Sequence, residues 1–127
     1  MDLMKVETAK APAAIGPYSQ AIKAGGFLYC SGQVPLVPET GALVAGGIER
    51  QTRQSLDNLQ QVLGEAGIDF SSVVKTTIYL MDLADFTIVN EIYAGYCGAV
   101  APARATVQVA GLPKGALVEI DAIAYIG

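Results

Sequence analysis

Two charged residues in this sequence occupy positions where a charge is expected to have either an ion-pair partner or a functional role. Arg104 follows Pro102-Ala103 at the start of an expected strand, and its guanidinium group is a planar fork suited to a carboxylate or a phosphate. Glu119 lies inside an apolar strand, where a carboxylate must be paired or have a raised pKa. A purely structural interpretation is also open, because a salt bridge would satisfy both residues.

Four other residues could supply contacts to a ligand. Asn90 is the one strongly polar residue beside an apolar helical stripe, although such an amide more often lies buried and bonds to the backbone. Tyr18 follows a Gly-Pro turn at the start of a strand. Ser31-Gly32 brings a hydroxyl beside bare backbone, which could let a ligand approach or simply admit a bulky neighbour. The sequence has no phosphate-binding loop, nucleophile elbow or metal-ligand cluster to set against these signals.

The overall composition excludes several classes of protein. The 127 residues include 8 Lys and Arg against 12 Asp and Glu, and the resulting charge of −4 is the wrong sign for binding nucleic acid through its phosphates. Because there is no His, histidine-dependent nucleophiles and histidine metal sites are excluded. Cys30 and Cys97 lack metal-ligand spacing and are interpreted as reduced, largely buried thiols. No segment has the apolar length of a signal peptide or a membrane span, so we expect a cytoplasmic protein.

The helices and strands that must position these residues are expected to form one α+β domain over residues 1–127. Two stretches, 48–66 and about 83–96, have the apolar period of a helix. Gly67 is expected to end the first helix, and Asp82 is placed to cap the second. Residues 9–17, rich in Ala and Pro, are expected to lack regular structure. Strands, two of them joined by a Gly-Gly hairpin turn, are expected at 22–24, 27–34, 73–81, 105–109 and 117–126.

Alternation along the last two strands predicts which residues share a face of the sheet. In the last strand one alternate set is uniformly apolar and suits the helices, while the set that contains Glu119 is mixed. In the strand before it, the same sorting puts Ala105 and Val107 on the helix side and Arg104 and Thr106 on the other. We therefore expect Arg104 and Glu119 to share the face without helices. Because 52% of residues are hydrophobic and only 16% charged, another subunit is expected to cover that face.

Taken in order, several segments resemble the RidA (YjgF/YER057c/UK114) family. The matching segments are 16–21, 31–35, 54–63, 89–90, 102–104 and 118–120. The most specific part runs from Pro102 through Ala110-Gly111-Leu112-Pro113 to Glu119-Ile120, and the resemblance covers essentially the whole chain. It implies a chorismate-mutase-like fold, a mixed sheet with two helices on one face. It also implies a homotrimer with three sites in the clefts between subunits.

The resemblance further implies an activity, that of a 2-iminobutanoate/2-iminopropanoate deaminase. Such an enzyme hydrolyses reactive 2-imino acids, products of pyridoxal-phosphate dehydratases, to 2-oxo acids and ammonia. By position, Arg104 is expected to clamp the substrate carboxylate, and Glu119 to orient or deprotonate the attacking water. No metal, cofactor or covalent nucleophile is needed, because a protonated imine is already electrophilic. The pocket is expected to be lined by Tyr18, Ser31, Gly32, Asn90 and the backbone of Thr106.

Besides a holdase-like role, two alternatives stay open from the sequence. One is a non-catalytic regulator that binds a small carboxylate on the same scaffold, and the presence of Glu119 argues against it. The other is the ribonuclease or translation-inhibitor activity associated with some family members, which the negative charge and the missing His disfavour. Many relatives have Cys where this chain has Thr106, so a redox response that depends on that thiol is not expected here.

Overall fold

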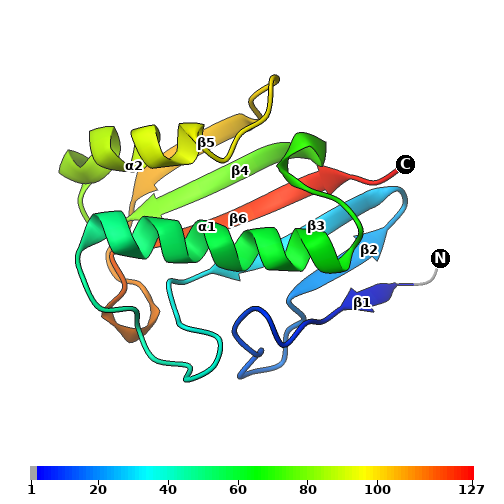
Figure 1. The fold of residues 1–127 in the computed structure, drawn as a ribbon, viewed down its shortest axis with the longest axis horizontal. Coiled ribbons are helices and arrows are strands. Elements are labelled where there is room, and N and C mark those ends of the chain that lie inside the picture. Colours follow the sequence, from blue (N-terminus) through cyan, green and yellow to red (C-terminus); the bar gives the residue numbers. More distant parts are fainter. Residues whose placement is uncertain (1–2) are drawn as a thin grey trace.

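A mixed sheet forms one layer of the structure, and two α-helices form the other, both on the same side of the sheet (Figure 1). The computed structural model describes residues 3–127. In the sheet, the strands follow the order β1-β2-β3-β6-β4-β5, and all neighbours are antiparallel except β4 and β5. The predicted α+β layout is confirmed. The strands are β1 (Met4–Val6), β2 (Ala21–Ala24), β3 (Phe27–Gln33), β4 (Val73–Leu80), β5 (Ala103–Gln108) and β6 (Val118–Tyr125).

Helix α1 (Ile48–Glu65) packs its apolar stripe on the sheet. The helix ends where predicted, because Gly67 adopts a φ of +81° that other residues rarely take. The second helix is shorter than the expected 83–96. Asp82 caps a single 3₁₀ turn by accepting from the Ala84 N–H, and α2 (Phe86–Ala94) follows it. The apolar side chains of α1 that are fully buried are Leu56, Leu59, Val62 and Leu63.

The predicted hairpin joins β2 to β3 through Gly25 and Gly26, whose φ values of +55° and +85° suit a tight turn. Strand β1 was not among the predicted strands. It has only three residues, two of them exposed, so it carries no alternation that a sequence pattern could reveal. Residues 9–17 lack helix and strand, as expected.

The prediction of which residues of β5 face the helices is wrong. Parallel pairing sets Arg104 beside Thr76 and Thr106 beside Ile78, and residues paired in this way point to the same face. Thr76 and Ile78 are buried beneath the helices, so Arg104 and Thr106 lie on the helix side. Glu119, which is paired with Tyr79, belongs to the other side, the open face. Arg104 and Glu119 therefore do not share a face of one chain.

The open face of the sheet carries aromatic and aliphatic side chains that no helix covers. Tyr29 is 48% exposed and Tyr125 is 55% exposed, and Val107 is also exposed. The expectation of a mixed, partly apolar second face is confirmed for these strands. None of the helices within residues 3–127 is long and apolar enough to cross a membrane.

Candidate active site

The carboxyl group of Glu119 lies over a break in the pairing of β3 with β6. Between Cys30 and Gln33 the register shifts by one residue, which is the pattern of a β-bulge. A Cβ atom built on Gly32 would stand 2.8 Å from the Glu119 carboxyl carbon, well inside van der Waals contact. Gly32 is therefore needed to admit the Glu119 side chain.

Ser31, on the same bulge, is tied to the segment that leads into β2. Its N–H donates to the Gln20 carbonyl at 2.9 Å, and its hydroxyl donates to the Ser19 carbonyl at 2.6 Å. Because the Ser31 hydroxyl donates its proton to a backbone carbonyl, this side chain holds the bulge in place. A cavity of about 470 Å³, the glutamate cavity, opens here and contains Tyr18, Ser31, Gly32 and Glu119 among its lining residues.

Burial raises the pKa of Glu119, and the negative charge of Asp121 raises it further. Asp121 is itself held on the open face, where it accepts from the Thr77 N–H at 3.2 Å and from the Tyr79 hydroxyl at 2.9 Å. A carboxylate with a raised pKa accepts a proton more readily than an exposed one. Glu119 therefore has the proton affinity expected of a general base.

Arg104 lies at the other side of the sheet, beneath α2. Its Nη1 donates to the Asn90 amide oxygen at 2.8 Å, and its guanidinium carbon stands 5.4 Å from the Phe86 ring centre and 5.1 Å from that of Tyr93. The Tyr93 hydroxyl is hydrogen-bonded at 2.6 Å to Thr76 Oγ1. These contacts hold the guanidinium plane in one orientation. Asn90 is exposed and bonds to a side chain, so the buried, backbone-bonded interpretation of this amide is wrong.

Within residues 3–127, Arg104 has no carboxylate partner. The two ion pairs found there are Lys5–Glu7 and Glu49–Arg53, each at 3.7 Å. Asn90 uses one of the guanidinium N–H groups, which leaves donors for an anionic ligand. A second cavity of about 520 Å³, the arginine cavity, is lined by Asn90, Tyr93, Cys97, Pro102 and Arg104 among others. Arg104 therefore forms no salt bridge within the described part of the chain.

Thr106 lies on β5, two residues beyond Arg104. Its side-chain oxygen is buried and has no hydrogen-bond partner among the described residues. The Val109 N–H donates to the Leu80 carbonyl at 2.9 Å, and alternate residues of a strand direct their backbone groups to opposite sides. The backbone groups of Thr106 and Arg104 therefore point to the outer edge of the sheet, where β5 has no neighbouring strand in this chain.

The predicted site residues thus form two groups rather than one. Tyr18, Ser31, Gly32 and Glu119 meet at the glutamate cavity, whereas Asn90 and Arg104 meet at the arginine cavity on the opposite face. Across residues 3–127 no cluster of three or more His, Cys, Asp or Glu side chains could hold a metal ion.

Sequence reasoning missed several residues at these cavities. Tyr93 lines the arginine cavity, and Phe86 lies outside that lining but faces the Arg104 guanidinium; the sequence pattern indicated only an apolar stripe for both, although their spacing around Asn90 places all three on one helix face. Gln20 and Lys114 line the glutamate cavity and were not singled out. Lys114 has a positive φ of 58°, an uncommon conformation that no local sequence signal announced.

Comparison with known proteins finds close relatives of this chain. The family model described as endoribonuclease L-PSP matches residues 8–126. Reactive Intermediate Deaminase A of Arabidopsis thaliana is 58% identical over 121 residues, 95% of this chain and 65% of that protein. The mouse 2-iminobutanoate/2-iminopropanoate deaminase is 54% identical over 122 residues, covering 96% of this chain and 90% of that protein.

A solved structure is also closely similar to this chain. A Rid-family protein of unknown function from Yersinia pestis superposes with a TM-score of 0.96 at 52% identity, covering 98% of this chain and all of that one. The shared fold and the identity over nearly the whole length confirm the resemblance inferred from the ordered segments. This chain belongs to the RidA family, whose members the endoribonuclease L-PSP model describes.

Proposed function

We propose that this protein hydrolyses reactive 2-imino acids to 2-oxo acids and ammonia, as a 2-iminobutanoate/2-iminopropanoate deaminase. The observation that carries the proposal is that Arg104 and Glu119 each lack an oppositely charged partner among residues 3–127. Arg104 is held in one orientation with free donors, and Glu119 is a half-buried carboxylate with a raised pKa. The first suits the carboxylate of an imino acid, and the second suits the water that attacks it. The mouse and Arabidopsis relatives carry names that state this type of activity.

The site is completed between subunits of a homotrimer, in which the arginine cavity of one subunit closes on the glutamate cavity of the next. Two observations support this assembly. The cavities lie on opposite faces of one chain, so a single small substrate cannot reach both. The open face also exposes apolar side chains, which an assembly would bury. A head-to-tail contact that repeats around a threefold axis closes into a ring with three equal sites.

The reaction needs only Arg104, Glu119 and the backbone of Thr106. Arg104 binds the substrate carboxylate and fixes the imine carbon, and the outward backbone groups of Thr106 lie beside the imine nitrogen. The water oxygen bonds to the carbon of the protonated imine while Glu119 takes a proton from that water. Glu119 then protonates the amino group, and the C–N bond breaks with its electron pair leaving on ammonia. As that bond breaks, the hydroxyl group passes its proton to Glu119, now a carboxylate again, and becomes the carbonyl of the 2-oxo acid.

The same properties bear on partners and compartment. We propose a cytoplasmic enzyme, because both cysteines are free thiols. Nucleic acid is not expected as a substrate, since a chain with a charge of −4 and no His offers neither phosphate attraction nor histidine catalysis. Nothing in the two cavities favours the regulator or the ribonuclease over the deaminase.

Trapping the imine tests the proposal. An amino-acid oxidase acting on alanine produces 2-iminopropanoate, and semicarbazide captures it as a product that absorbs ultraviolet light. Added protein is expected to divert the imine and to slow the formation of that product. The Arg104→Ala variant, confirmed as folded by circular dichroism, is expected to divert none. If the wild-type protein leaves the trapping rate unchanged, this function is refuted for these substrates.

A further inference from the structure

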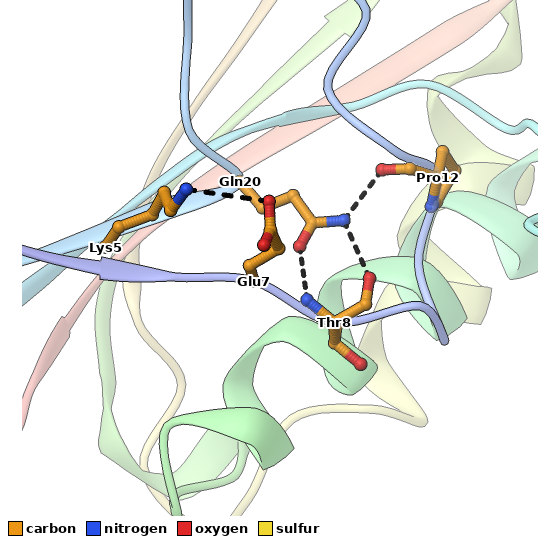
Figure 2. A network of polar contacts seen from close by, with 5 residues as sticks. All are labelled: Lys5, Glu7, Thr8, Pro12 and Gln20. Atoms are coloured by element: carbon orange, nitrogen blue, oxygen red, sulfur yellow. Dashed lines mark hydrogen bonds and ion pairs between the residues drawn. The ribbon is translucent and has the colours of Figure 1, made fainter.

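One buried amide ties the irregular N-terminal segment to the sheet. Gln20 is only 3% exposed, and Figure 2 shows its side chain facing the backbone of Thr8 and Pro12. Its Oε1 accepts from the Thr8 N–H at 2.7 Å. Its Nε2 donates to the Thr8 carbonyl at 3.1 Å, to that of Ala11 at 3.4 Å and to that of Pro12 at 2.8 Å. A single side chain thus satisfies several backbone groups of a segment that has no regular structure.

Other hydrogen bonds do little to hold this segment. The remaining hydrogen bonds of residues 9–17 are local. The Lys10 N–H donates to Thr8 Oγ1, and the Tyr18 N–H donates to the Gly16 carbonyl. Each connects residues two apart, so neither fixes the segment to the sheet. The path of the chain over residues 8–12 is therefore held by the Gln20 hydrogen bonds together with the burial of Ala11 in the core.

The residues that follow form one wall of the glutamate cavity. Pro12, Ala13 and Ile15 line it from the N-terminal segment, and Val34 and Leu36 line it from the chain after β3. Ile15 is 78% exposed, so a large apolar side chain is held at the surface rather than packed in the core. We call Pro12, Ala13 and Ile15 the apolar wall.

The glutamate cavity is much larger than the smallest substrate. A three-carbon imino acid has the bulk of roughly four waters at about 30 Å³ each, which is about a quarter of the cavity volume of about 470 Å³. With the carboxylate held by the Arg104 of the neighbouring subunit and the attacking water beside Glu119, the substituent on the imine carbon points into the part of this cavity that the neighbour leaves open. That space is bounded mainly by apolar side chains.

We propose that the apolar wall is the subsite for the substrate side chain. It favours imino acids with branched aliphatic side chains over 2-iminopropanoate, whose side chain is a methyl group. Gln20 is the residue that positions this wall. This inference rests on the proposed function and adds the class of side chain to it. Ile15 contacts the substituent directly and so determines specificity. Gln20 acts through the backbone that it holds.

The test compares two imines made in place by one amino-acid oxidase, 2-iminopropanoate from alanine and 2-imino-4-methylpentanoate from leucine. The wild type is expected to have the higher kcat/KM for the leucine-derived imine. Ile15→Ala is expected to lower kcat/KM for that imine by about tenfold, the discrimination typical of lost apolar contacts, and to leave the value for the alanine-derived imine within twofold. Leu3→Ala is the matched control, because Leu3 is 67% exposed and lies outside the cavity lining. It is expected to change neither value.

Gln20→Glu tests the positioning role. The new carboxyl group cannot replace an amide that donates to three carbonyl groups, so the wall is released. The same selective loss for the leucine-derived imine is expected, mainly as a rise in KM. Gln60→Glu, on the exposed side of α1, is the matched control. Because Ile15 is exposed, Ile15→Ala remains a test even if Gln20→Glu fails to fold.

The outcomes separate this inference from the function beneath it. If wild type turns over the alanine-derived imine but Ile15→Ala lowers both kcat/KM values equally, or neither, the side-chain subsite is overturned and the deaminase remains. A wild type that prefers the alanine-derived imine also overturns it. If wild type turns over neither imine, the proposed function itself fails.

Discussion

Substituting Gly32 by Ala tests whether the position of the Glu119 carboxyl group controls catalysis. The backbone at Gly32 does not require glycine, because its φ is outside the left-handed region. The added methyl group would instead stand 2.8 Å from the Glu119 carboxyl carbon and 3.0 Å from its Cγ. The substitution therefore displaces one functional side chain and leaves the chain path intact.

The expected magnitude follows from these distances. Carbon atoms in contact stay about 3.5–4.0 Å apart, so the Glu119 carboxyl group must move by roughly 1 Å. A displacement of about 1 Å at a reacting group typically costs about 100-fold in rate, and we expect a loss of this size in kcat. Because Glu119 is flexible and can turn aside, the free energy of unfolding is expected to change by no more than about 1 kcal/mol.

The imine-trapping assay measures kcat, and thermal unfolding measures stability. Gly64→Ala is the matched control, since Gly64 lies on α1 with no atom within 4 Å of the added Cβ. This control is expected to keep full activity. A Gly32→Ala enzyme with wild-type kcat would show that the close approach of Glu119 to Gly32 has no part in the reaction.

Three further predictions follow from the same structure. Asn90→Leu removes the hydrogen bond that orients Arg104, and we expect the KM of the imine to rise about tenfold with kcat little changed; an unchanged KM would contradict the role of Asn90. Asp121→Asn removes a negative charge that raises the pKa of Glu119. The acid limb of the pH profile of kcat/KM, where protonation of Glu119 abolishes activity, is therefore expected to shift to lower pH. A shift to higher pH would refute this. Burial, with the charge of Asp121, raises the pKa of Cys30 to about 12, so mass spectrometry is expected to find Cys30 alkylated by iodoacetamide at pH 8 only after unfolding.

The sequence predicts those parts of the fold that local interactions determine. The period of α1 and the glycine that ends it are both within one stretch of chain, as is the Gly25-Gly26 turn. The face of β6 is also predictable, because one alternate set of its residues is entirely apolar and the structure buries it beneath the helices. Strong local patterns of this kind leave one arrangement favoured.

The face of β5 could not be predicted for a physical reason. It is an edge strand, and its exposed and half-buried residues alternate without a clear apolar set. Its orientation is decided by the parallel pairing of Arg104 with Thr76, a contact between residues far apart in the chain. The same long-range pairing separates Arg104 from Glu119. The role of Gln20 was equally hidden, because its partners are backbone groups that carry no residue-specific signal.

Mixing two inactive variants tests most directly whether the site is shared between subunits. Arg104→Ala and Glu119→Gln are each expected to be inactive alone. In trimers formed at random from equal amounts of both, a site is intact when one subunit supplies Arg104 and its neighbour supplies Glu119, which occurs for about a quarter of sites. We therefore predict that the mixture, with mixed trimers verified by native mass spectrometry, recovers about a quarter of wild-type activity. Mixed trimers as inactive as the two parents would contradict a site completed between subunits.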